Sequence, residues 1–215
     1  MSFPEPPNPS RTNTSNSLTG PRDSESHDPH SALLNVSCFD LLLIELVPLA
    51  FRMANEQAER EAEWIKGAPK GKDGGLDEEE VRENAHWRLD MLGYRVGLGI
   101  VERFSRDKPR FTDTLDVIKF LCKDIWTIVF RKQIDNLKTN HRGIYVLTDG
   151  TFKPLGRMST ERGEGALTRA QPFLWFPSGI IRGALAGMGI TASVQGETSG
   201  LPGATFQIKT AGSRP

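Results

Sequence analysis

Hydrophobic and polar positions divide the chain into a polar beginning, three long amphipathic stretches and a C-terminal part made of short apolar runs. The stretch from Trp87 to Phe104 is the most informative, because its apolar residues recur at the three- and four-residue spacing of a helix. These residues are Leu89, Leu92, Val96 and Ile100. Gly93, Gly97 and Gly99 interrupt the pattern, although a glycine inside a helix costs roughly 0.5 to 1 kcal/mol relative to alanine. We therefore expect other backbones to pack closely on this helix, from its own domain on one side and from a second chain on the other.

A longer amphipathic stretch precedes it and predicts a first helix from about Asn35 to Trp64. Ser37 followed by Asp40 resembles a capping box, and Pro48 predicts a kink. The apolar residues form two stripes, one of Phe39, Leu42, Leu43, Leu46, Ala50 and Met53, and another of Leu41, Ile44, Pro48 and Phe51. A helix that is apolar on two faces is normally buried on two faces. The second stripe packs either inside the domain or against a partner, and the pattern favours neither.

The second half of the chain predicts a third helix followed by a β-hairpin. The helix runs from about Asp113 to Asn136, with apolar residues at core-helix spacing. The hairpin covers Gly143 to Leu155, because two apolar runs flank Asp149-Gly150, a dipeptide typical of a type I′ turn.

A short helix and two further strands complete the predicted fold. Ser178 is placed to cap the helix and Gly189 to end it. The alternating runs Ile190 to Val194 and Thr205 to Lys209 predict half-buried strands. The fold class is therefore α+β, with three or four helices packed on one face of a small antiparallel sheet.

Composition predicts one domain between polar tails. Residues 1–32 are rich in Pro, Ser, Asn and Thr and predict a disordered tail, because they cannot bury enough apolar surface to offset the entropy of ordering. Residues 33–210 form the domain, with flexible loops at about 66–80 and 156–171. Residues 211–215 form a short C-terminal tail.

Charge and cysteine content indicate which partners and which cellular compartment to expect. The 27 basic and 27 acidic residues balance, which argues against a general attraction to nucleic acid. The two cysteines, Cys38 and Cys122, lie in apolar helical stretches and indicate buried thiols in a reducing compartment. No apolar run approaches the ~18 residues of a membrane span. We expect a cytoplasmic protein that reaches membranes only through a partner or a lipid.

The candidate catalytic and ligand-binding motifs lack the spacing or the further residues that their chemistry requires. The Gly-Lys-rich loop at 66–80 lacks the spacing of a Walker A motif. Ser178 lacks the flanking glycines of a nucleophile elbow, and His27 and His30 lie in the polar tail without a further ligand. We expect no catalytic residue, no metal site and no cofactor.

Three segments carry a resemblance to a known family: LDMLGYRVG at 89–97, LDVIKFLCKDIWTIVFRKQIDNLKTNHRGIYVLTD at 115–149, and SGIIRGALAGMGI at 178–190. They closely resemble the small core subunits of the TRAPP membrane-tethering complex. Within this Bet-three-like family they are most similar to the branch called subunit six in mammals and named by its mass of thirty-three in yeast. The resemblance extends over roughly Ser37 to Ile208, apart from the two polar loops.

The resemblance implies a scaffold rather than an enzyme. In this family the first two helices pair with another small subunit, here the founding Bet-three-like one, which carries an acyl chain on a cysteine just before the third helix. The corresponding turn of this chain, Asp107 to Phe111, has no cysteine, so acylation there is not implied. The assembled complex tethers vesicles between endoplasmic reticulum and Golgi, and it exchanges guanine nucleotide on a Rab-type GTPase. The implied partners are other TRAPP subunits and, through the complex, that GTPase and the Golgi membrane.

The expected pairing residues lie on the first two helices. They are Leu41, Leu42, Ile44 and Phe51 from the first, and Leu89, Gly93, Val96, Gly97 and Ile100 from the second. The sequence leaves open which stripe of the first helix and which glycine of the second face the partner. The alternative function is a stand-alone domain that binds an apolar small molecule or an acyl chain between helices and sheet.

Overall fold

The computed structural model describes the domain from just before its first helix to its last strand, with short gaps. The described residues are 34–66, 78–140, 142–158 and 164–211. They form one unit from Asn35 onward. The predicted tail at 1–32, the interior of the predicted loop at 66–80 and the last residues of the predicted tail at 211–215 lie outside the described residues.

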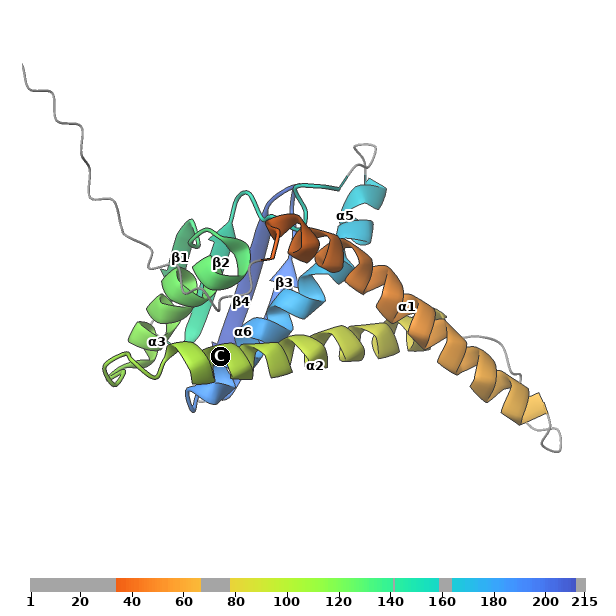
Figure 1. The fold of residues 1–215 in the computed structure, drawn as a ribbon, viewed down its shortest axis with the longest axis horizontal. Helices are drawn as coiled ribbons and strands as arrows, with labels where there is room; N and C mark the ends of the chain where they lie inside the picture. Colours follow the sequence, from red (N-terminus) through yellow and green to blue (C-terminus); the bar gives the residue numbers. More distant parts are fainter. Residues whose placement is uncertain (1–33, 67–77, 141, 159–163, 212–215) are drawn as a thin grey trace, which may run out of the picture. The chain divides into compact units, whose positions relative to one another are not determined.

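A four-stranded antiparallel sheet underlies the helices, in the order β1-β2-β4-β3 (Figure 1). The strands are β1 (Asn136–Thr139), β2 (Ile144–Asp149), β3 (Ala192–Glu197) and β4 (Ala204–Thr210). Leu147 of β2 lies opposite Phe206 of β4, and both side chains are fully buried. Alternate residues thus turn one face of the sheet toward the helices, as expected for period-two strands. The α+β fold class is confirmed.

Helix α6 (Trp175–Gly187) lies between the sheet and helix α2 (Glu78–Phe104) (Figure 1). The end of α6 follows the sequence expectation, because Gly189 adopts a left-handed φ of 79° and Ile190 N donates to Leu185 O at 2.9 Å. Its beginning differs. Ser178 lies within the helix rather than at its cap, since the chain already turns helically at Trp175.

The glycines of α2 and α6 let the two backbones touch. A Cβ added to Gly93 would lie 2.2 Å from Phe176 O, and one added to Gly97 would lie 2.2 Å from Ile180 O. The contact is reciprocal: a Cβ on Gly179 would lie 2.2 Å from the carbonyl oxygen of Asp90. The predicted close approach is therefore real, but at Gly93 and Gly97 the neighbour is a helix of the same chain.

The predicted third helix is shorter and less regular than expected. It consists of α3 (Thr114–Phe120), the π-helical turn η1 (Leu121–Ile125) and α4 (Trp126–Phe130). Arg131 adopts a left-handed φ of 62° and ends it, so the expected end at Asn136 was wrong. Within the π-helical turn, Cys122 O accepts a hydrogen bond from Ile134 N at 3.0 Å. That bond holds the chain that leads into β1 against the helix.

The hairpin is placed differently from the prediction. β2 pairs with β1, which precedes it, and no described strand follows Asp149 before β3. The glycine with a left-handed backbone is Gly143, with φ of 82°, whereas Gly150 has no such angle. A type I′ turn at Asp149-Gly150 requires positive φ at both positions, so it is excluded.

Helix α5 (Glu164–Ala170) and the 3-10 turn η2 (Gln171–Leu174) occupy the end of the segment expected to be a loop at 156–171. Ala166 and Ala170 are buried, which explains the order that glycine-rich composition did not indicate. The remainder of that segment includes residues outside the described part of the chain.

Candidate interaction surface

Helix α1 (Val36–Lys66) buries one row of small and medium side chains against the rest of the domain. The row is Leu43, Val47, Ala50 and Ala54, at the spacing of one helix face. Leu43 and Ala50 belong to the first predicted stripe, whereas Val47 and Ala54 belong to neither. The buried face therefore coincides with neither predicted stripe. The second half of α1 extends away from the sheet (Figure 1).

Large apolar side chains remain exposed on both flanks of that row. Leu41 is 63% exposed and Leu42 56% exposed. We define the α1 apolar surface as Leu41, Leu42, Ile44, Leu49 and Met53, all of which are exposed. Helix α2 adds Trp87, Val96 and Phe104, which are exposed as well. Exposed apolar residues in such number on one pair of helices are typical of a surface that another protein covers.

The structure separates the predicted pairing residues into two groups. Leu89, Gly93 and Gly97 are buried in the domain's own core, so assigning them to a partner interface was wrong. Their burial follows from the close packing of α2 on α6. Gly99 has nothing within 4 Å of an added Cβ, so among these glycines it lies on the open side.

The other predicted pairing residues are accessible to different extents. Leu41, Leu42, Ile44 and Val96 are exposed. Phe51 and Ile100 are partly buried against the core, and the Phe51 ring lies 6.0 Å from the Trp175 ring. That these residues contact a partner stays a prediction.

Sequence reasoning left six exposed apolar residues of α1 and α2 out of the predicted interface. They are Val36, Leu49, Met53, Trp64, Trp87 and Phe104. Leu49 and Met53 follow Leu42 after seven and eleven positions, a spacing that places the three on one side of a helix. That spacing was the signal that could have found Leu49 and Met53.

A buried carboxylate fixes the first half of α1. Asp40 accepts from Lys153 Nζ at 3.2 Å and from Arg157 Nη2 at 2.9 Å. The predicted capping box was therefore wrong, because Asp40 faces these cations and Ser37 N donates instead to the Asn35 side chain at 2.9 Å. Loss of both cations would leave the buried carboxylate of Asp40 unpaired, which is costly, so this contact helps to specify how α1 lies on the domain.

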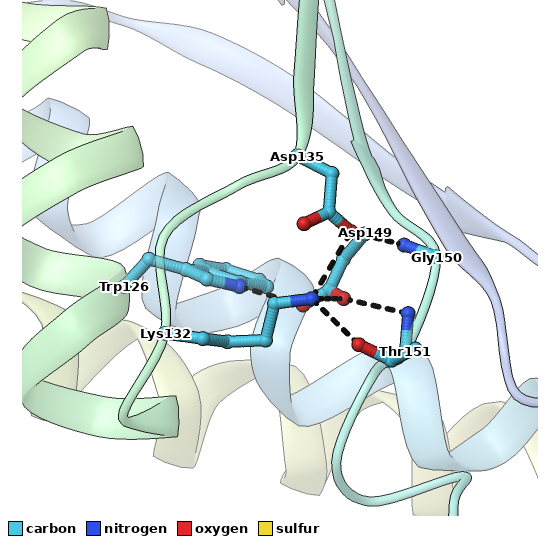
Figure 2. Close-up of polar contacts among 6 residues, drawn as sticks. All are labelled: Trp126, Lys132, Asp135, Asp149, Gly150 and Thr151. Carbon is cyan, nitrogen blue, oxygen red and sulfur yellow. Dashed lines mark hydrogen bonds and ion pairs between the residues drawn. The ribbon is translucent and has the colours of Figure 1, made fainter.

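A second buried carboxylate, Asp149 at the end of β2, joins the sheet to the helix that precedes it (Figure 2). It accepts hydrogen bonds from Trp126 Nε1 at 2.9 Å, Lys132 Nζ at 2.5 Å and Thr151 N at 3.1 Å. Asp135 lies beside it and accepts from Gly150 N at 2.7 Å. These bonds engage both oxygens of a fully buried Asp149, so the cluster is suited to holding structure rather than to binding a substrate.

The pKa values in this cluster follow from its hydrogen bonds. The Gly150 N–H, followed by the Lys132 ammonium, lowers the pKa of Asp135. Burial acts to lower the pKa of Lys132, but hydrogen bonds and charge attraction from Asp149 and Asp135 together outweigh burial and raise it. Each shift favours the charged form that makes the ion pair.

The two cysteines differ in solvent exposure. Cys122 is buried, and burial raises the pKa of its thiol to about 12, so it behaves as a small apolar group. Cys38 is exposed near the start of α1, so the expectation of a buried thiol there was wrong.

The Ser178 hydroxyl is buried and has no hydrogen-bond partner among the described residues, so no base contacts it there. In the same part of the chain, His, Cys, Asp and Glu side chains form no group of three or more that could hold a metal ion. No described helix is long and apolar enough to cross a membrane.

The fold and the exposed apolar side chains of α1 and α2 define the class of protein as an α+β domain with a helical surface that another protein can cover. Residues 39–211 match the Transport protein particle (TRAPP) component family. The chain belongs to this family.

Similar proteins place the chain within the family. It is 51% identical over 121 residues to trafficking protein particle complex subunit 6b of Danio rerio, covering 56% of this chain and 76% of that protein. Subunit 6B of Homo sapiens is 50% identical over 121 residues, covering 56% of this chain and 75% of its own. An uncharacterized protein of Schizosaccharomyces pombe is 38% identical over 176 residues, covering 82% of this chain and 64% of that protein. The resemblance to the subunit-six branch is confirmed.

A solved structure supports the fold. It is trafficking protein particle complex subunit 3 from Naegleria fowleri, covalently bound to palmitic acid, with a TM-score of 0.51. The match covers 77% of this chain and 98% of that one at 12% identity. At this identity it bears on the fold alone.

Proposed function

We propose that this protein is a non-catalytic core subunit of a TRAPP complex and pairs with a Bet-three-like small subunit through α1 and the outward side of α2. The α1 apolar surface is the observation that carries the proposal. Full burial of one such side chain contributes about 1.5 to 3 kcal/mol. Leu42, Leu49 and Met53 lie on one side of the helix and can enter the same contact.

The proposal includes partners beyond this pair. Other TRAPP subunits contact the heterodimer, and a Rab-type GTPase meets the protein only through the assembled complex. The protein is cytoplasmic and reaches endoplasmic reticulum–Golgi and Golgi membranes peripherally through that complex. It uses no cofactor and binds no nucleic acid.

The test is a charge placed in the α1 apolar surface. Leu42→Glu with Met53→Glu should weaken binding to a purified Bet-three-like subunit by at least tenfold, because desolvating unpaired carboxylates in an apolar contact is costly. Ser199→Glu is the control, since it adds a carboxylate at an exposed polar site outside α1 and α2. Isothermal titration calorimetry gives the affinities, and circular dichroism shows whether each variant stays folded.

Unchanged affinity in the folded double variant would refute pairing through this surface. Substitution of Gly97, in contrast, is not a test of pairing, because its neighbours are Ile180 and Ala184 of α6. A leucine there would damage the domain itself.

The alternative of a stand-alone domain that binds an apolar small molecule or acyl chain between helices and sheet gains no specific support. Fully buried side chains occupy the contact of α6 with the sheet, including Ile181, Leu147 and Phe206. Native mass spectrometry of the isolated chain tests it, because a small ligand retained by the monomer would count against a purely scaffolding role.

A further inference from the structure

β3 is an edge strand, and part of its backbone points away from the sheet. β3 pairs only with β4 among the described strands. Thr191 O accepts from Ala211 N at 2.8 Å, and hydrogen-bonded pairs alternate along an antiparallel ladder. In this register Ser193 and Gln195 exchange hydrogen bonds with β4, whereas Val194 directs its N–H and C=O outward.

The next outward carbonyl shows how this edge can be bound. Gly196 O accepts a hydrogen bond from Gln171 Nε2 at 2.7 Å, so a group of the same chain already uses the outer side of β3. The N–H and C=O of Val194 form no such hydrogen bond with the other described residues. An unpaired donor and acceptor on an edge strand form a template for another strand.

A hollow of about 400 Å³ lies beside this edge. Val194, Gln171, Trp175, Ser178 and His86 contribute to its lining. Ser178 is 5% exposed, and its hydroxyl has no hydrogen-bond partner among the described residues. An unpaired buried hydroxyl is costly, which is consistent with a site completed by a further polar group.

A second hollow of about 470 Å³ shares His86 with the first and is acidic. Glu80, Glu83 and Asp90 contribute its carboxylates, and Trp87 lies among them. Asp90 is already paired with Arg182, so the acidic character available to a ligand comes from Glu80 and Glu83. The first hollow favours an extended backbone beside Val194, but Lys209 also lines it, so basic side chains of that segment are expected over the second hollow rather than over the strand edge.

We propose that an extended basic segment of another subunit of the complex adds to β3 as a fifth strand. Its backbone exchanges hydrogen bonds with Val194, and its Lys or Arg side chains reach Glu80 and Glu83. Strand addition of this kind takes affinity from the backbone and specificity from side-chain sites. The inference rests on the proposed function, because it takes the segment from a TRAPP complex. Val194 lies outside α1 and α2, whereas the acidic hollow includes Trp87 of the exposed α2 side, so the exchange rate at Val194 is the measurement that tests strand addition by itself.

The test compares hydrogen exchange in the free full-length chain and in the reconstituted complex that contains it. We expect the Val194 amide to exchange at least tenfold more slowly in the complex. Residue-resolved mass spectrometry measures the rate. Slower exchange at α1 with unchanged exchange at Val194 would overturn the strand addition while leaving the proposed function intact. A wild-type chain that does not assemble at all would overturn both.

Two substitutions at Val194 separate backbone pairing from packing. Val194→Pro removes the outward N–H and leaves the β3–β4 hydrogen bonds in place, since proline is tolerated where a strand N–H faces outward. Val194→Ala keeps the N–H and loses the apolar side chain. We expect proline to weaken assembly at least tenfold and alanine less than threefold. Equal losses overturn the proposal, and if circular dichroism shows that the proline variant is unfolded, the wild-type exchange rate decides.

The acidic hollow has its own test. Glu80→Gln with Glu83→Gln should weaken assembly several-fold at low salt and flatten its dependence on salt, because fewer charges are then paired. Asp107→Asn with Asp113→Asn, at exposed positions outside α1 and α2, is the matched control. An identical salt dependence in the two double variants overturns the assignment of a basic segment.

Discussion

The ion pair between Lys132 and Asp135 makes stability depend on pH. The pKa of Asp135 is lowered in the folded protein, chiefly by the Gly150 N–H and then by Lys132. Its contribution is therefore present above the ordinary pKa of 3.8 and is lost as pH falls through the lower folded value. For Lys132 the pKa is raised, so its contribution is lost only as pH rises above 10.5.

Asp135→Asn should reveal the acid limb. We expect the difference in unfolding free energy between wild type and this variant to shrink as pH is lowered from about 6 to about 3. Urea unfolding followed by tryptophan fluorescence measures it. A difference that is independent of pH would contradict the assigned pKa shift.

Two glycines of α2, two positions apart, should respond in opposite ways to alanine. Gly97→Ala places a Cβ 2.2 Å from Ile180 O and 2.8 Å from Ala184 N, both backbone atoms that cannot move freely. We expect a loss of about 1 to 3 kcal/mol in unfolding free energy. Gly99→Ala meets nothing within 4 Å and should stabilise the helix by up to about 1 kcal/mol. Chemical denaturation of the two variants side by side measures both, and equal effects would contradict the packing of α2 on α6.

At the scale of elements, the connection between β1 and β2 contains Gly143, whose backbone is left-handed. Gly143→Ala should cost about 1 to 2 kcal/mol, because a side chain is strained at a φ of 82°. Gly150→Ala places its Cβ 3.5 Å from Asp135 Oδ2, an ordinary contact, and should change stability by less than about 0.5 kcal/mol. Thermal unfolding of both variants distinguishes them. The reverse order of stability would favour a type I′ turn at Asp149-Gly150.

The elements also show what local sequence could and could not specify. Periodicity located helix α2 and strand β4. In β4 it also identified the buried face, whereas the buried row of α2 retains only Leu89 of the four apolar positions that predicted the helix. The rest of that row is Val81, Ala85, Gly93, Gly97 and Val101. The hairpin was misplaced because Asp149 is bound by Trp126 and Lys132, which lie well before it in the chain. A dipeptide signal cannot register such partners.

The prediction of the interface residues was limited in the same way, because it too depended on contacts with distant parts of the chain. Gly93 and Gly97 indicate that a backbone comes close, but a helix of the same chain and a helix of a partner leave the same signal in the sequence. Only the position of α6 decides between them. The exposed residues Leu41 and Leu42 were found because two apolar stripes on one helix exceed what one domain buries.

The whole molecule should become more stable when its partner is present. A ligand that binds only the folded state raises the unfolding free energy by about 2.7 kcal/mol at a hundredfold excess over Kd. For a chain of 215 residues this corresponds to a rise in Tm of roughly 5 to 10 °C. Differential scanning fluorimetry with increasing Bet-three-like subunit measures the rise.

The α1 variant separates this gain from the stability of the isolated domain. Leu42→Glu with Met53→Glu changes exposed positions and leaves the buried row, which includes Leu43 and Ala50, untouched. Its own Tm should therefore stay within a few degrees of wild type, because exposed substitutions typically change stability by about 0.5 kcal/mol or less. Added partner should no longer raise it. A full rise in the variant would mean that the partner binds elsewhere, and the exposed apolar residues of α1 would then need another explanation.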